Sequence, residues 1–145
     1  YHVEKKAFLL VKQFRIPVYL NDKSIKYTYE LCAGLVDKNK SIEEIAVEEI
    51  DEECGYKVKI EDLKKITSFF TNVGVSGAKQ HLFFTTVNDS QKIHNGGGIN
   101  DEQIELFFLD ENKIDDLLFD ESKAKTPGLM FSLYWFLKNK DKLGL

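Results

Sequence analysis

Three acidic residues, Glu49, Glu52 and Glu53, lie close together in a segment whose pattern predicts a helix. Residues three and four positions apart are neighbours on one face of an α-helix, so Glu49 is expected beside both other acids. Carboxylates in this arrangement repel one another and resist burial at the edge of an apolar face. A divalent cation would relieve both problems, so the spacing predicts a metal site and chemistry on phosphate groups.

The segment that carries these acids has the start and end signals of a helix. Ser41 and Glu44 match a capping box, in which each side chain accepts a hydrogen bond from the other residue's backbone N–H group. Gly55 stands where a left-handed residue commonly follows a helix. We therefore expect a helix over 41–54 after a loop over 33–40. The apolar residues expected to face the core are Ile42, Ile45, Ala46 and Ile50.

The rest of the chain predicts strands and helices without regular strand–helix alternation. Turn-forming residues over 16–24 predict a connecting turn, and the polar segment 89–103 predicts a functional or mobile loop. The element order favours an α+β protein, or an α/β/α sandwich with a mixed sheet. The expected strands are 6–14, 26–32, 65–71, 80–87 and 104–109, and the further helices are 112–119 and one that begins at Thr126-Pro127.

The bulk composition is that of one ordinary globular domain. The 145 residues are 43% hydrophobic and 30% charged, with a net charge of −4, which predicts a single domain over 1–145. An acidic chain without a basic stripe argues against nucleic acid and anionic membranes as partners. We expect a cytoplasmic protein with Cys32 and Cys54 reduced. Because the chain opens at Tyr1, almost directly in a strand-like run, we also expect that an N-terminal strand segment is missing.

The segment 34–56, GLVDKNKSIEEIAVEEIDEECGY, resembles the Nudix box, G-x5-E-x7-R-E-U-x-E-E-x-G-U, in which U is apolar. Residues in register with it are Gly34, Glu49, Ile50, Glu52, Glu53, Gly55 and Tyr56. Flanking segments resemble the nucleoside-diphosphate-sugar hydrolases of that superfamily, and most of all their uridine diphosphate glucose pyrophosphatase branch. Those segments are VKQFRIPVY at 11–19, YELCAGLVD at 29–37, GVSGAKQ at 74–80 and the glycines at 96–98.

Two positions of the box depart from the pattern. Lys40 occupies the place of the first glutamate, and Glu48 replaces the arginine. In the family that arginine helps to hold the glutamates by ion pairing, so an acid there adds repulsion. One hypothesis is a charge-swapped pair between Lys40 and Glu48; two solvated side chains are an equal alternative.

The resemblance implies a Nudix-like fold in which the box forms a loop-helix-loop. It implies Mg²⁺ as the cofactor, with Mn²⁺ as a possible substitute. Glu52 would bind the metal directly or through water, or would orient the nucleophile, and Asp101 and Glu105 are alternatives to Glu102. The implied metal ligands are the main-chain carbonyl of Ala33 and the carboxylates of Glu49, Glu52, Glu53 and Glu102, and these four acids are also the implied catalytic residues.

The resemblance also suggests residues that shape the substrate pocket. An arginine suits bidentate contact with phosphate, although an ion pair between Arg15 and Glu30 is an equal alternative. The glycines at 96–98 fit a flexible lid and a disordered linker equally well, and His81 and His94 are expected to be structural or solvated. The implied substrate-binding residues are Arg15, Glu30, Gly34, Lys79 and Gln80.

The substrate expected from the resemblance is a nucleotide sugar. Val73 stands about where ADP-ribose hydrolases of the superfamily usually carry a proline, which favours the UDP-sugar branch. The predicted reaction converts UDP-glucose and water to UMP and glucose 1-phosphate, and the branch implies a homodimer. The alternatives are an ADP-ribose or ADP-sugar pyrophosphatase, and a non-catalytic Nudix-like module that binds a nucleotide or a protein.

Overall fold

The computed structural model describes residues 1–99 and 102–145. Its strands are β1 (Ala7–Gln13), β2 (Thr28–Glu30), β3 (Lys64–Thr71), β4 (Ala78–Phe84), β5 (Ile104–Asp110) and β6 (Ala124–Lys125). Its α-helices are α1 (Ile16–Asn21), α2 (Ile42–Glu49), α3 (Ile114–Phe119) and α4 (Pro127–Leu143). A π-helical turn, η1 (Ile50–Cys54), continues α2, and short 3₁₀ turns are η2 (Ile60–Asp62), η3 (Asp89–Gln91) and η4 (Glu111–Lys113).

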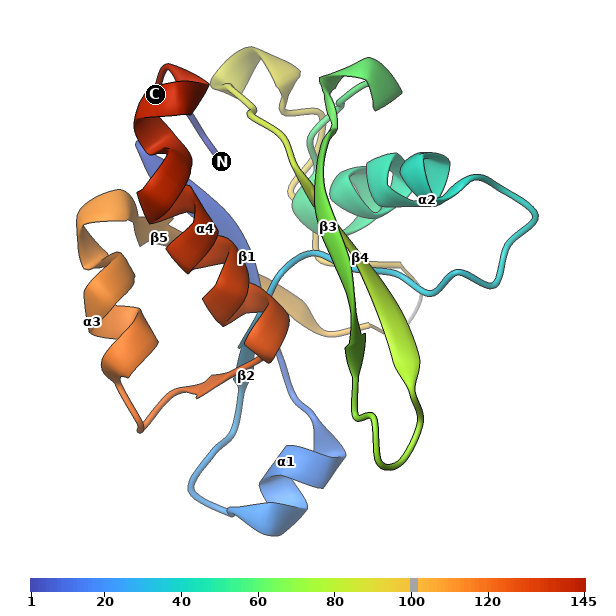
Figure 1. The fold of residues 1–145 in the computed structure, drawn as a ribbon, viewed down its shortest axis with the longest axis vertical. Helices are drawn as coiled ribbons and strands as arrows, with labels where there is room; N and C mark the ends of the chain where they lie inside the picture. Colours follow the sequence, from blue (N-terminus) through green and yellow to red (C-terminus); the bar gives the residue numbers. More distant parts are fainter. Residues whose placement is uncertain (100–101) are drawn as a thin grey trace.

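Two sheets lie between the helices. The larger sheet has the order β5-β1-β2-β6, and it is mixed because β1 runs antiparallel to both neighbours whereas β2 and β6 are parallel. The second sheet is the antiparallel β3–β4 hairpin. Figure 1 shows α3 and α4 on one side of the molecule and α2 on the other, with the hairpin between α4 and α2. This is the mixed α+β architecture that the element order predicts.

The main core forms where β1 meets α4. Leu10 and Val11 are both fully buried, so β1 is covered on both of its faces, as its unbroken apolar run predicts. On α4, Leu129, Leu133 and Phe136 recur at helical spacing and are also fully buried. Burying each of these side chains contributes about 1.5–3 kcal/mol. The strand that leads into the site is therefore held rigidly.

The structure corrects the expectation of a turn over 16–24. Ile16–Asn21 forms the helix α1, with Pro17 in its first turn. A proline is tolerated there because the N–H groups of the first helical turn have no partner within the helix. The ring of Tyr19 packs 5.4 Å from that of Phe14 and supports this short helix.

The helix expected over 41–54 is present but does not remain an α-helix to its end. Ser41 and Glu44 form the predicted capping box, and Gly55 adopts the predicted left-handed conformation, with φ of 75°. Between them, α2 gives way to the wider π-helical turn of η1. Such turns are uncommon and are frequently found at functional sites, and this one carries two of the three acids. None of the helices within the described residues has the length and apolar character needed to cross a membrane.

Candidate functional site

Glu53 is the most buried acid of the site. Its residue is only 4% exposed, and one carboxylate oxygen, Oε2, accepts a hydrogen bond of 3.1 Å from the backbone N–H of Ala33. The side-chain amide of Gln13 lies 3.5 Å from the other oxygen, Oε1. Burial raises the pKa of Glu53 to about 7, although hydrogen bonds from the Cys32 thiol and the Ala33 N–H oppose the shift. A buried carboxylate whose pKa is raised in this way is stabilised by a bound proton or a bound cation.

Glu49 lies directly against Gly34. A Cβ atom at Gly34 would stand 2.0 Å from Oε1 of Glu49, so no larger residue fits there without moving that carboxylate. Burial raises the pKa of Glu49, and the charge of Glu52 raises it further. The box glycine is therefore needed for close approach between the loop and the acid, rather than for a positive φ.

Glu102 reaches the same acidic cluster from a segment distant in sequence. Its Oε2 accepts a hydrogen bond of 3.0 Å from the backbone N–H of Ile99. Burial is the main reason that the pKa values of Glu49 and Glu53 are raised, and the charge of Glu102 adds to both.

The two alternatives to Glu102 are placed differently. Glu105 points to the neighbouring strand, where its carboxylate lies 2.5 Å from the ammonium of Lys12. The other alternative, Asp101, lies outside the described residues.

The three glycines at 96–98 close over the end of the box helix. The N–H groups of Gly97 and Gly98 donate to the carbonyls of Glu53 (2.9 Å) and Glu52 (3.1 Å), which satisfies acceptors that a helix end leaves free. A Cβ at Gly96 would lie 2.2 Å from the carbonyl oxygen of Glu53, and all three glycines have positive φ. Instead of forming the expected lid or linker, the segment is docked against the end of the helix.

His94 holds this glycine segment in place. Its Nε2 lies 2.7 Å from the Asp51 carboxylate, and its Nδ1 accepts a hydrogen bond of 3.0 Å from the N–H of Gly96. His94 was expected to be structural or solvated, and these contacts give it a structural role. No spacing in the sequence indicates the partner, because Asp51 is 43 positions away.

The donor chemistry of the cluster suits a hard divalent cation. The candidate ligands are all oxygen atoms, which Mg²⁺ prefers. The mutual repulsion of the acids and the burial of Glu53 are the conditions that a cation relieves. Among the described residues, the carboxylates of the box do not yet converge within 4.8 Å as a group of three, so metal binding requires rotation of these side chains.

A different group of three potential ligands does meet that spacing, namely His2, Glu4 and Asp89. The Lys5 ammonium already contacts both the Asp89 carboxylate and the His2 ring there. The Lys5 ammonium thus occupies the position that a metal ion would take, so we predict no metal site at this group.

Arg15 and Glu30 form the ion pair that was one of the two expectations for them. Nε of Arg15 lies 2.7 Å from one carboxylate oxygen of Glu30, and its Nη2 lies 2.8 Å from the other. The bidentate geometry ties the end of β1 to β2. Arg15 is still 48% exposed along its side chain, so the pair lies at the surface of the site.

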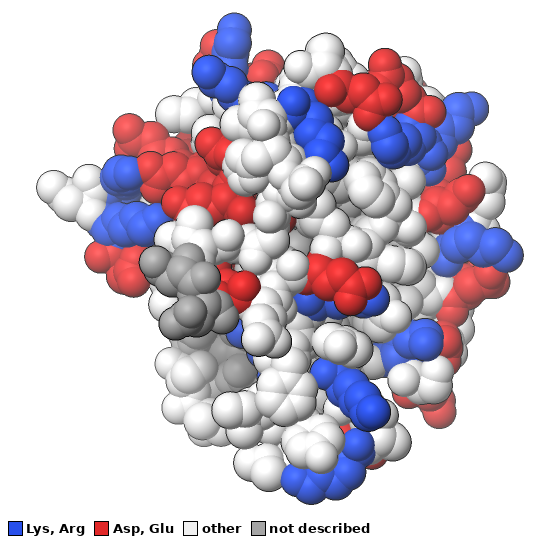
Figure 2. All heavy atoms as spheres, turned by 180° about the vertical axis from the view of Figure 1, so that it is seen from behind, with Lys and Arg blue, Asp and Glu red and all other residues white. Residues whose placement is uncertain are grey.

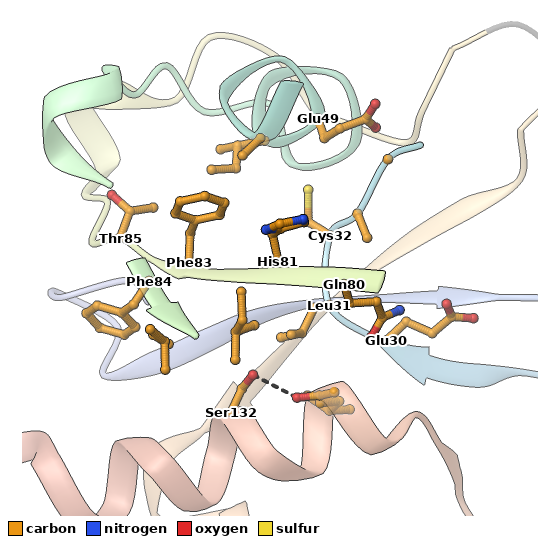
Figure 3. Close-up of a pocket in the computed structure, with 18 of the residues that line it drawn as sticks. Glu30, Leu31, Cys32, Glu49, Gln80, His81, Phe83, Phe84, Thr85 and Ser132 are labelled. Carbon is orange, nitrogen blue, oxygen red and sulfur yellow. Dashed lines mark hydrogen bonds between the residues drawn. The ribbon is translucent and has the colours of Figure 1, made fainter. Parts of the chain in front are cut away.

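A cavity of about 440 Å³ extends inward from the acidic cluster, between α2, β4 and α4. Figure 3 shows Glu49, Glu30 and Gln80 toward one end of it, with the box helix above β4 and α4 below. Four of the five predicted substrate residues line the cavity, and so do the candidate ligands Ala33 and Glu49. These four are Glu30, Gly34, Lys79 and Gln80.

Sequence reasoning missed two polar residues in the wall of this cavity. His81 has a buried Nδ1 atom without a hydrogen-bond partner among the described residues, although the residue was expected to be structural or solvated. Cys32 lies beside it, between β2 and the box helix (Figure 3). Only the β alternation of β4 could have indicated that His81 points inward, because it is two positions from the inward-facing Phe83.

Lys40 and Glu48, the two residues that depart from the box pattern, contact each other. The Lys40 ammonium contacts the Glu48 carboxylate directly, as the charge-swap hypothesis expects. A second lysine of the same loop, Lys38, lies 3.4 Å from Glu48 and 4.0 Å from Glu49. Glu48 therefore has two cationic neighbours, and one of them also reaches the acidic cluster.

Known proteins resemble the chain across most of its length. It is 33% identical, over a 164-residue alignment, to the uridine diphosphate glucose pyrophosphatase of Bos taurus, which covers 94% of this chain and 74% of that protein. It is 35% identical over 107 residues to the GDP-mannose pyrophosphatase of Cronobacter sakazakii, which covers 73% and 54% of the two chains. No family model matches the chain.

The chain belongs to the Nudix hydrolases. Its likeness is to the branch that hydrolyses nucleoside-diphosphate sugars, and Nudix hydrolases in general need a divalent metal ion. A crystal structure of an ADP compounds hydrolase shares the fold, with a TM-score of 0.69 and 17% identity over 97% of this chain and 69% of that one. The Nudix fold expected from the box is thereby confirmed.

Proposed function

We propose that this Nudix hydrolase cleaves the pyrophosphate of nucleoside-diphosphate sugars, with UDP-glucose and water giving UMP and glucose 1-phosphate. One observation carries the proposal. The acidic cluster and the cavity meet at Ala33, Gly34 and Glu49, so a ligand that fills the cavity would present its charged groups to a metal ion held by the acids. A diphosphate flanked by two larger groups has the shape and the charge for such a metal-bridged contact.

The acids divide into roles according to their burial and position. Glu49, Glu53 and the Ala33 carbonyl would hold the metal, which we propose is Mg²⁺, with Mn²⁺ as a substitute. Such an ion neutralises phosphate oxygens and lowers the pKa of a bound water molecule. Glu52 is half-buried beside Glu49 and would bind the metal or orient the attacking water. Glu102 supplies a further carboxylate, which accepts a hydrogen bond from the backbone N–H of Ile99.

Residues at the rim of the cavity would orient the substrate. Lys79 and Gln80 lie on β4 and are exposed, so they can meet a phosphate or the nucleoside. Arg15 lies outside the lining of the cavity but pairs with Glu30, which lines it, and an oriented guanidinium suits contact with an anionic group. Because this pair is oriented before a substrate binds, less conformational freedom is lost on binding.

Two substrate classes compete with UDP-sugars. One relative is a GDP-mannose pyrophosphatase, and the fold is shared with an ADP compounds hydrolase. Val73 stands at the place where ADP-ribose hydrolases usually carry a proline, which argues against ADP-ribose as the substrate. It lies exposed in the turn of the β3–β4 hairpin. The uridine diphosphate glucose pyrophosphatase is the relative with more of its length matched.

The test offers the protein four substrates, UDP-glucose, GDP-mannose, ADP-ribose and ADP-glucose, with Mg²⁺ or with EDTA. The nucleoside monophosphate released is measured by chromatography. We expect metal-dependent UMP release that disappears in Glu53→Gln. Binding without turnover of any substrate would favour a non-catalytic module, and faster cleavage of ADP-ribose than of UDP-glucose would contradict the argument from Val73.

We also propose that the protein is a homodimer of the cytoplasm. The outer face of α4 exposes four large apolar side chains in one stripe, and such a patch commonly marks an interface. Those residues are Met130, Phe131, Tyr134 and Leu137. The free thiols of Cys32 and Cys54 agree with a reducing compartment. Light scattering after size-exclusion chromatography tests the dimer, and Phe131→Asp should shift it toward monomer.

A further inference from the structure

Lys38 is the basic residue of the box loop that reaches the acidic cluster. Its ammonium lies 4.0 Å from Oε1 of Glu49, whereas the ion pair of Lys40 is with Glu48. Lys38 lies in the loop that begins at Gly34, and its side chain is 39% exposed. Figure 2 shows acidic side chains gathered on the left of the molecule, on the side of α2, with basic side chains beside them.

This position creates a conflict between two ligands of opposite charge. The acids attract a divalent cation, but they repel the diphosphate of the substrate. A single positive charge among them has opposite effects on the two, because it opposes the cation and favours the anion. A unit charge about 8 Å from a doubly charged ligand in a water-like medium changes a binding equilibrium by about five-fold, and salt screens the effect.

We propose that Lys38 balances the charge of the site, so that it weakens binding of the divalent cation and strengthens binding of the diphosphate. The part that concerns the substrate rests on the proposed function, whereas the part that concerns the cation does not. Lys38 is the residue suited to this role because its ammonium reaches both Glu48 and Glu49. Lys40, two residues on, supplies the same charge to Glu48.

The experiment compares Lys38→Met, Lys38→Arg and Lys40→Met with the wild-type protein. Mn²⁺ is titrated into metal-free protein, and free Mn²⁺ is followed by electron paramagnetic resonance. UDP is then titrated into the Mn²⁺-saturated protein by calorimetry. We expect Lys38→Met to bind Mn²⁺ about five-fold more tightly and UDP about five-fold more weakly. Lys38→Arg keeps both affinities, and Lys40→Met changes each by less than about two-fold because its charge is farther from Glu49.

The opposite signs separate charge balance from a merely structural role. A loop that loses its anchor would weaken both ligands, so weaker binding of both Mn²⁺ and UDP to Lys38→Met would overturn the proposal. Unchanged affinities, or equal effects from Lys40→Met, would overturn it as well. Lys38→Gln repeats the measurement with a polar side chain, and 0.5 M salt should remove most of the difference from wild type.

The two proposals fail in distinguishable ways. If no nucleotide sugar is hydrolysed but the opposite shifts in Mn²⁺ and UDP binding are present, the enzymatic proposal alone fails. If UDP-glucose is hydrolysed, Lys38→Met should raise KM about five-fold with kcat nearly unchanged, because the charge acts on binding of the anion. An equal fall in kcat would instead contradict the role given to Lys38.

Discussion

Replacing Glu53 with glutamine should stabilise the protein in the absence of metal. The wild-type carboxylate is buried, and its pKa is raised from 4.5 to about 7. At pH values above 7 this corresponds to about 3 kcal/mol of lost folding free energy, because ionisation is less favourable in the folded state than in the unfolded chain. Glutamine resembles the neutral acid and can still accept the hydrogen bond from Ala33 N–H.

The dependence on pH gives the sign of this effect. Below pH 4.5 the carboxyl group is protonated in both states, so Glu53 and its Gln variant should be similar in stability. As the pH rises toward 7, the unfolded chain ionises and the wild-type protein loses stability, while the variant does not. In urea unfolding with EDTA, the free energy of unfolding of the variant should therefore exceed that of the wild-type protein by about 2–3 kcal/mol at pH 8. At pH 5 the difference should be less than about 1 kcal/mol.

Metal binding should reverse the order of stability, so that the wild-type protein becomes more stable than Glu53→Gln. At pH 8 with saturating Mn²⁺, the wild-type protein gains stability through binding and Glu53→Gln gains much less. Glu61→Gln is the matched control, since Glu61 is exposed and should change stability by less than about 0.5 kcal/mol. A variant that is less stable than wild type in EDTA at pH 8 would refute the reasoning, because it would show that the charged form of Glu53 stabilises the fold.

Three further predictions concern the box and the glycine segment. Gly34→Ala should lower kcat/KM at least about ten-fold, because its Cβ would displace the Glu49 carboxylate, and Mn²⁺ titration should show weaker binding. Gly96→Ala should lower the unfolding free energy by about 2–4 kcal/mol in urea, since its φ is 67° and its Cβ meets a helix carbonyl. Lys40→Glu with Glu48→Arg should be better tolerated than the sum of the single changes, and strict additivity in activity would contradict a charge-swapped pair.

Local patterns predicted the box helix well because its signals are contained in a few neighbouring residues. The capping box of Ser41 and Glu44 needs only three residues of separation, and Gly55 ends the helix through its own φ. The strand β1 could be predicted for the same reason, because its continuous apolar run indicates burial on both faces. The adjacency of Glu49 to the other acids likewise follows from helical spacing alone.

Contacts between distant segments could not be predicted in this way. The docking of Gly97 against Glu53 joins residues 44 positions apart, and nothing in a run of glycines distinguishes a docked segment from a linker. The inward direction of His81 depends on which face of the hairpin covers the cavity, which only the tertiary structure decides. The helix α1 was missed because Pro17 indicates a turn and the first turn of a helix equally well.

The site shows why a stable fold would keep acids that oppose folding. Glu53 is buried, and Glu49 stands against Gly34, so the metal-free protein retains repulsion among its carboxylates that Lys38 offsets only in part. The surrounding structure does not relax this repulsion, because the capping box fixes one end of the helix and the glycine segment fixes the other. The energy held there becomes available when a cation binds, since binding removes the repulsion. Metal affinity and metal-free stability should therefore change in opposite directions in every variant that neutralises a cluster acid.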